Sequence, residues 1–127
     1  MKHSFNYRVI YKDTDAEGVV YYADYLGFFE RGRTELLRKM GIDLKKMRDE
    51  EKIVFTITKV ECDYLAPAMY DDEIIVTTEI ASKTKARVVF KQEVLRGDVL
   101  LVCGKIEACA VSLKTFRPQR LPDCFQR

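Results

Sequence analysis

Two aspartates separated by one residue, Asp13 and Asp15, precede a stretch in which apolar residues have helical spacing. Gly18, between the second aspartate and that stretch, permits a sharp turn. The first amides of a helix lack partners and carry the positive end of its dipole. They can therefore hold the oxyanion that forms when an ester or thioester carbonyl is attacked. A nearby carboxylate can attack that carbonyl or activate a water. Asp ahead of a helix is more often a cap, so these residues alone leave both roles open.

Other common chemistries lack the residues they need. His3, near the N-terminus, is the only histidine, which disfavours Ser-His-Asp and Cys-His catalysis. No phosphate-binding or dinucleotide-binding glycine motif is present, and the Cys and His spacing does not resemble a zinc site. We interpret three of the cysteines as small apolar strand residues in a reducing compartment. These three are Cys62, Cys103 and Cys109. The fourth cysteine, Cys124, lies near the C-terminus.

A strand and a long helix are expected to position the aspartates. Alternating apolar residues predict a half-buried strand over residues 4–12. Helical spacing then begins beyond Tyr22, and Gly41 would end the helix as its C′ residue. Gly27 and Gly32 within this helix each cost about 1 kcal/mol relative to Ala, so we expect a packing reason, most simply a close approach to a sheet.

The rest of the chain favours β-structure after a short polar helix that Asp43 would cap. A phase shift in the apolar pattern predicts a bulge near Thr58 and Lys59, and Arg96–Asp98 has the composition of a tight hairpin turn. Short connections favour antiparallel pairing, so we expect one α+β domain over residues 1–127. The expected strands cover residues 53–66, 73–81, 86–95 and 99–113.

Composition excludes several partners. The formal charge is +2, with acidic and basic residues interspersed, so we expect no nucleic-acid binding. No apolar run approaches the roughly 18 residues that span a bilayer, and the N-terminus has no signal-peptide core. We therefore expect a cytoplasmic protein without membrane insertion.

Two segments carry a family resemblance. The stretch "DTDAEGVVYYADYLGFFERGRTELLR", residues 13–38, resembles the signature of the YbgC-like and 4-hydroxybenzoyl-CoA thioesterases, and "DYLAPAMYDDEI", residues 63–74, is a second family-like segment at the expected distance. The resemblance implies a hotdog fold, in which an antiparallel five-stranded sheet wraps around one long helix. It also implies a homodimer or homotetramer with active sites at the subunit interface.

The resemblance also implies site residues. The family's catalytic carboxylate falls on Asp15 and its backbone oxyanion donor on the amide of Tyr22, whereas Asp13 matches a position that does not attack. The implied activity is hydrolysis of an acyl-CoA, with no metal or redox cofactor. Tyr22 stands where many YbgC-like proteins have His, although the hydroxybenzoyl branch has Tyr there.

The CoA phosphates would require cations near the pocket mouth. Lys83, Lys85 and Arg87 lie at an expected strand-turn-strand corner where the family often binds the nucleotide end, although a solvated hairpin explains them equally well. A second basic segment, with Lys114, Arg117 and Arg120, is a weaker candidate.

Two other functions fit the same fold. The alternative to catalysis is a binding module for acyl-CoA or acyl-carrier protein in the same groove, which would not require a carboxylate aimed at the thioester. Dehydratase or hydratase chemistry ranks last, because it usually relies on a pocket histidine that this chain lacks.

Overall fold

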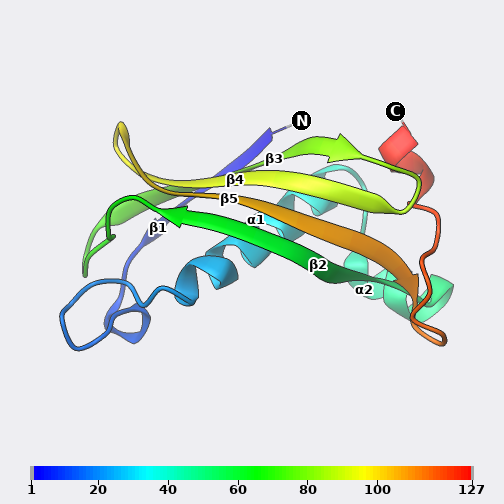
Figure 1. Cartoon of the computed structure of the whole chain (residues 1–127), viewed down its shortest axis with the longest axis horizontal. Helices are drawn as coiled ribbons and strands as arrows, with labels where there is room; N and C mark the ends of the chain where they lie inside the picture. Colours follow the sequence, from blue (N-terminus) through cyan, green and yellow to red (C-terminus); the bar gives the residue numbers. More distant parts are fainter. Residues whose placement is uncertain (1, 127) are drawn as a thin grey trace.

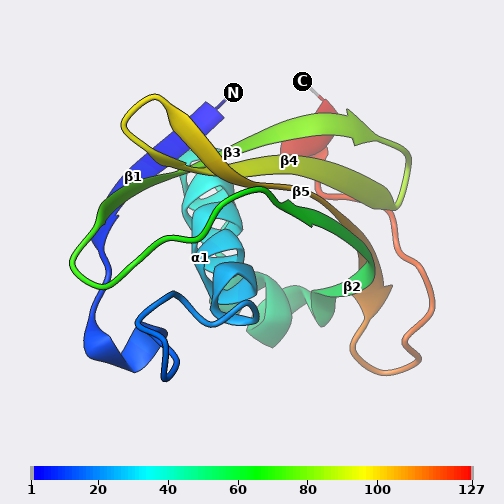
Figure 2. The same cartoon turned by 60° about the vertical axis from the view of Figure 1, so that its left-hand side comes forward.

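Five antiparallel strands form one sheet that wraps around a single long helix in the computed structural model, which describes residues 2–126 (Figures 1 and 2). The strand order is β1-β3-β4-β5-β2, so β1 and β2 are the edges. This arrangement confirms the expected α+β class and the hotdog architecture. The elements are β1 Lys2–Arg8, α1 Asp24–Lys39, α2 Leu44–Lys46, β2 Ile53–Tyr64, β3 Glu73–Lys83, β4 Arg87–Arg96 and β5 Val99–Ser112.

Helix α1 lies against the concave face of the sheet and ends where the sequence predicts. Phe29 and Leu36 on its inner face are completely buried, as its amphipathic pattern requires. Gly41 follows the helix with φ +88°, a conformation that favours glycine, and terminates it. No helix within residues 2–126 is both long enough and apolar enough to cross a bilayer.

The two glycines within α1 differ. A Cβ added to Gly32 would lie 2.4 Å from Oγ1 of Thr78 in β3 and 3.2 Å from Nε2 of Gln92 in β4, so this helix turn approaches the sheet closely, as expected. A Cβ on Gly27 would meet nothing within 4 Å. The packing reason predicted for Gly27 is therefore wrong, because that position faces open space.

The first strand is shorter than predicted. It ends at Arg8, and Tyr11–Asp13 form a turn of 3₁₀ helix. The Asp13 carboxylate accepts a hydrogen bond from the Ile10 amide at 3.0 Å, and Thr14 Oγ1 donates to the Tyr11 carbonyl at 2.9 Å. Such local bonds compete with strand pairing, which explains why the alternating pattern does not continue as a strand.

The later strands match their predictions closely. The register of β2 against β5 shifts between Ile57 and Lys59, which confirms the predicted bulge. Gly97, with φ +59°, lies in the two-residue turn between β4 and β5. Asp43 accepts a hydrogen bond from the Lys46 amide at 3.1 Å and caps α2, which continues into a π-helical turn over Met47–Glu51.

Candidate active site

A narrow loop connects the 3₁₀ turn to α1 and carries both predicted catalytic groups. The Tyr21 amide donates to the Asp13 carbonyl at 2.8 Å, and the Asp15 amide donates to the Val19 carbonyl at 2.9 Å. These bonds fold residues 13–21 back on themselves. Gly18 lies near the tip with φ +82°, a conformation that an L-residue adopts only with strain. The sequence "DTDAEG" thus encodes a compact hairpin-like loop.

Asp13 is a structural residue. The residue is 7% exposed, and its carboxylate accepts hydrogen bonds from the Tyr7 hydroxyl at 2.8 Å and from the Ile10 amide. Burial, with the neighbouring Asp13 carboxylate, raises the pKa of Tyr7 to about 12, so its hydroxyl keeps its proton. Asp13 therefore anchors the loop to β1 through Oδ2.

Asp15 has a different environment from Asp13. It is exposed, and one carboxylate oxygen, Oδ1, accepts a hydrogen bond from the Glu17 amide at 2.9 Å. This local bond fixes the side chain at the loop tip, as in an Asx-turn. Oδ2 accepts no hydrogen bond from any described residue. The structure thus leaves one anchored and one available oxygen at this position.

The Tyr22 amide is unpaired. It precedes α1 and donates to no group within the described chain, as is also true of the Ala23 amide, whereas the amides of Tyr21 and Asp24 both donate. The Tyr22 carbonyl, in the next peptide group, accepts a hydrogen bond from the Tyr64 hydroxyl at 3.2 Å. An open pocket of about 250 Å³ lies beside it. The pocket is lined by Val20, Tyr22, Tyr25, Tyr64, Leu65, Ala66 and Pro67.

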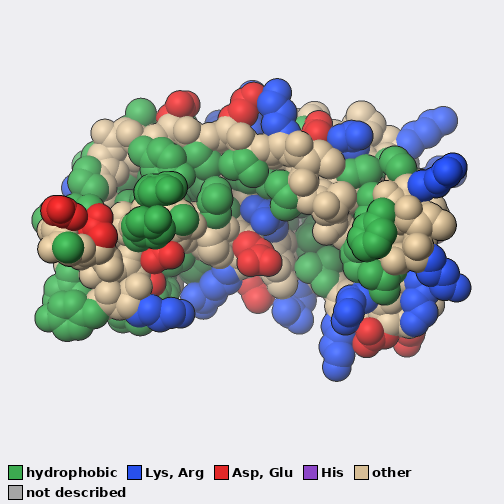
Figure 3. Space-filling view, turned by 60° about the horizontal axis from the view of Figure 1, so that its bottom comes forward, with side chains coloured by type: hydrophobic (Ala, Val, Ile, Leu, Met, Phe, Trp, Pro, Cys, Tyr) green, Lys and Arg blue, Asp and Glu red, His purple; other side chains and the backbone are tan. Residues whose placement is uncertain are grey.

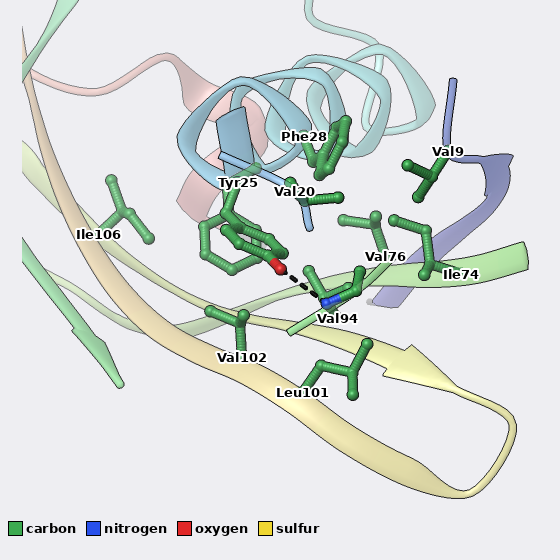
Figure 4. Packing of buried hydrophobic residues seen from close by; sticks show 12 residues of the cluster. Val9, Val20, Tyr25, Phe28, Ile74, Val76, Val94, Leu101, Val102 and Ile106 are labelled. Atoms are coloured by element: carbon green, nitrogen blue, oxygen red, sulfur yellow. Dashed lines mark hydrogen bonds between the residues drawn. The ribbon is translucent and has the colours of Figure 1, made fainter. Parts of the chain in front are cut away.

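The second family-like segment lies directly against this loop. The Val20 amide donates to the Ala68 carbonyl at 2.8 Å, and the Tyr70 amide donates to the Gly18 carbonyl at 3.1 Å. Tyr25 reaches from α1, and its buried hydroxyl accepts a hydrogen bond from the Ala68 amide at 2.9 Å (Figure 4). The structure therefore brings together two motifs that are far apart in the sequence.

An ion pair anchors the far side of this segment. The Asp72 carboxylate accepts hydrogen bonds from the Arg96 guanidinium at 2.8 Å and from the Met69 amide at 2.9 Å. Partial burial opposes the charged form, but these bonds outweigh it and hold the pKa of Asp72 below its ordinary value. The pocket wall is thereby tied to the end of β4.

The predicted CoA-binding cations lie elsewhere in the chain. Lys83 ends β3 and Arg87 begins β4, with Lys85 in the turn between them. The aspartate loop packs near the start of β3, so the length of that strand, about 35 Å, separates it from this corner. Figure 1 shows the loop and the corner at opposite ends of the molecule. One chain does not bring the two groups together.

Two members of the cation group have partners. The Arg87 guanidinium forms an ion pair with Glu107 in β5 at 3.0 Å, and the Lys83 ammonium donates to the Phe125 carbonyl. The Thr58 hydroxyl and Arg87 lower the pKa of Glu107, although partial desolvation opposes them. The corner is thus an ordered part of the surface.

Sequence reasoning missed a buried polar network beneath α1. Gln92 is fully buried and donates to the Phe29 carbonyl at 2.8 Å and to Thr78 Oγ1 at 2.7 Å. Its carbonyl oxygen accepts from Arg33 at 3.0 Å. One feature of the sequence could have revealed this network: Gln92 occupies an inward-facing position of β4, between the buried residues Phe90 and Val94.

Comparison with known proteins identifies the family. The family model described as the thioesterase superfamily matches residues 17–103, well over half of the chain. The chain belongs to the thioesterase superfamily. The resemblance inferred from the two motifs is therefore confirmed.

Relatives within the superfamily cover almost the whole chain. The acyl-CoA thioesterase YbgC of Haemophilus influenzae is 37% identical over 119 residues, which cover 94% of this chain and 88% of that protein. The acyl-CoA thioesterase YbgC of Helicobacter pylori is 38% identical, over 94% of this chain and 93% of the relative. A probable thioesterase from Bartonella henselae has a crystal structure that superimposes with a TM-score of 0.90 at 37% identity, covering 96% of this chain and 100% of that one. The chain is thus YbgC-like in sequence and in fold.

Proposed function

We propose that the protein hydrolyses acyl-CoA thioesters to a carboxylic acid and free CoA, with Asp15 as the base or nucleophile and the Tyr22 amide as the oxyanion donor. One observation carries the proposal. An unpaired amide at the rim of a largely apolar pocket lies on the same loop as a carboxylate with one available oxygen. The names of the YbgC relatives agree with this activity.

The loop geometry suits a carbonyl between the two groups. Asp15 lies opposite Val19, and Tyr22 follows Val19 by three residues, a span of at most roughly 10 Å if the backbone is fully extended. That spacing leaves room for a thioester carbonyl between the Asp15 side chain and the Tyr22 amide. The acyl group would then enter the pocket beside Tyr25 and Tyr64.

Two routes use these groups in the same positions. In the first, Asp15 takes a proton from water, and the resulting hydroxide adds to the carbonyl carbon. In the second, the carboxylate adds directly, and water later hydrolyses the mixed anhydride. In both, negative charge develops on the carbonyl oxygen, where the Tyr22 N–H can stabilise it. The C–S bond then breaks, and CoA leaves as a thiolate that takes up a proton.

We further propose that the working unit contains a homodimer formed through β2. This strand is an edge of the sheet, has twelve residues without proline, and exposes the apolar side chains of Ile57, Val60 and Tyr64. A long edge strand of this kind is a template for pairing with a second chain. Antiparallel pairing of β2 with its copy would extend the sheet across both subunits.

The dimer also gives the distant cations a role. Antiparallel pairing places the Ile53 end of one β2 beside the Tyr64 end of the other. The partner's Lys83, Lys85 and Arg87 would then lie at the same end of the assembly as the Tyr22 pocket. Each site would combine the Asp15 loop of one subunit with the CoA-binding cations of the other.

Thiol release from a panel of acyl-CoAs and acyl-carrier proteins tests the activity. The panel should contain short, medium, branched and aromatic acyl groups, because Tyr22, Tyr25 and Tyr64 give the pocket an aromatic wall. We expect catalytic turnover of at least one acyl-CoA. Saturable binding across the panel without thiol release would instead show a binding module.

A further inference from the structure

Arg33 is a guanidinium without an anionic partner. It leaves the middle of α1 and donates to the Gln92 carbonyl oxygen at 3.0 Å. Gln92 is itself held by two buried hydrogen bonds, so it fixes the guanidinium but brings no charge. No ion pair within residues 2–126 includes Arg33. A partly desolvated guanidinium is stabilised by a nearby opposite charge, so a carboxylate of a second chain would pair with it favourably.

The guanidinium lies in a groove that opens between α1 and β2. The groove has a volume of about 150 Å³, and apolar side chains, among them Leu37, Phe55 and Ile57, form its walls. Glu30, one helical turn before Arg33, lies at the same groove. Burial lowers the pKa of Arg33, and the charge of Glu30 partly offsets this effect. Figure 3 shows acidic and basic side chains together at the hollowed centre of this face.

We propose that Glu30 and Arg33 form two reciprocal ion pairs across a two-fold axis, each with the opposite residue of a second copy of the chain. The inference rests on the homodimer proposed above and names the charges that specify it. We infer that the groove binds a second copy of this chain, because it carries both a carboxylate and a guanidinium, which can each pair with the opposite group of an identical groove.

The position of the charges within α1 supports this pairing. The helix covers Asp24–Lys39, so its midpoint lies between Arg31 and Gly32, and Glu30 and Arg33 are equally far from that point. A two-fold axis there makes the two helices antiparallel and sets Glu30 opposite the partner's Arg33.

Other positions of the axis do not bring opposite charges together. An axis moved to Arg33 would place two guanidinium groups against each other. An axis moved to Glu30 would do the same with two carboxylates. Of these three positions, the central axis satisfies both charges at once.

Charge reversal tests the pairing. We expect Glu30→Arg and Arg33→Glu each to raise the dimer dissociation constant at least about 100-fold, because each leaves like charges in a desolvated groove. The double variant should return most of the wild-type affinity. Arg38→Glu is the matched control on the same helix, since Arg38 is exposed and, among the described residues, pairs only with Glu35 of its own chain at 3.5 Å.

Mixing the two single variants gives the sharpest readout. A heterodimer of Glu30→Arg with Arg33→Glu regains both opposite-charge contacts, so sedimentation equilibrium should show dimers in the mixture that neither variant forms alone. If Arg33→Glu fails to fold, Glu30→Arg alone still decides the outcome. Single variants that dimerise like wild type would overturn the ion pairs while leaving the dimer intact. A monomeric wild type would instead refute the dimer proposed above.

Discussion

Gly32→Ala probes the close contact between α1 and the sheet. The new Cβ would lie 2.4 Å from Oγ1 of Thr78, a completely buried side chain that is already bonded to Gln92. Thr78 is β-branched, and its hydroxyl cannot move aside without breaking that bond. The substitution therefore acts on the polar network that holds Arg33 as well as on the packing.

The expected change in the free energy of unfolding combines one stabilising effect with two destabilising effects. Ala is favoured over Gly within a helix by about 1 kcal/mol. Overpacking costs about 1–3 kcal/mol, and a buried donor left unsatisfied on Gln92 costs a further 1–3 kcal/mol or so. We expect Gly32→Ala to lower the free energy of unfolding by about 1–5 kcal/mol.

Gly27→Ala is the matched control, because it changes the same residue type in the same helix where nothing lies within 4 Å. It should raise stability by up to about 1 kcal/mol. Urea unfolding at one protein concentration, followed by circular dichroism, measures both variants. Equal stability of the two, or a Gly32→Ala protein as stable as wild type, would refute this description of the helix–sheet contact.

Two further predictions concern the loops that build the pocket. Tyr7→Phe removes a 2.8 Å hydrogen bond to the buried Asp13 carboxylate and should destabilise the protein by about 1–3 kcal/mol in urea unfolding; an unchanged midpoint would contradict the anchoring role of Asp13. Asp72 has a depressed pKa in the folded state, so its ion pair with Arg96 contributes stability above the unfolded value of 3.8 and loses it as pH falls through the folded value. The difference in thermal stability between wild type and Asp72→Asn should therefore shrink as pH falls below 3.8 and vanish once pH lies below the folded pKa of Asp72, whereas a constant difference would exclude this linkage.

Local signals in the sequence predicted most of the elements. The helix has both an apolar stripe and a terminating glycine, and the phase shift around Thr58 located the bulge. Such features depend on a few neighbouring residues. The early end of β1 was not predictable, because it depends on hydrogen bonds that Asp13 makes only once the loop has folded.

Features that depend on tertiary structure were less accessible. The two glycines of α1 have the same local context, and only the sheet distinguishes Gly32 from Gly27. The motif located Asp15 and Tyr22 on one loop, but the separation of the Lys83 corner from that loop follows from the length and direction of β3. An unpaired charge such as that of Arg33 emerges only when the neighbours are known.

The steady-state rate of the Asp15→Asn variant tests the central claim most directly. The assay should use the acyl-CoA that wild type hydrolyses fastest, with Glu17→Gln as the control for loss of a neighbouring exposed carboxylate. We predict that kcat of Asp15→Asn falls at least about 100-fold while its affinity for CoA stays unchanged, and that Glu17→Gln remains within a few-fold of wild type. An Asp15→Asn protein with wild-type kcat would contradict the assignment of the reacting carboxylate.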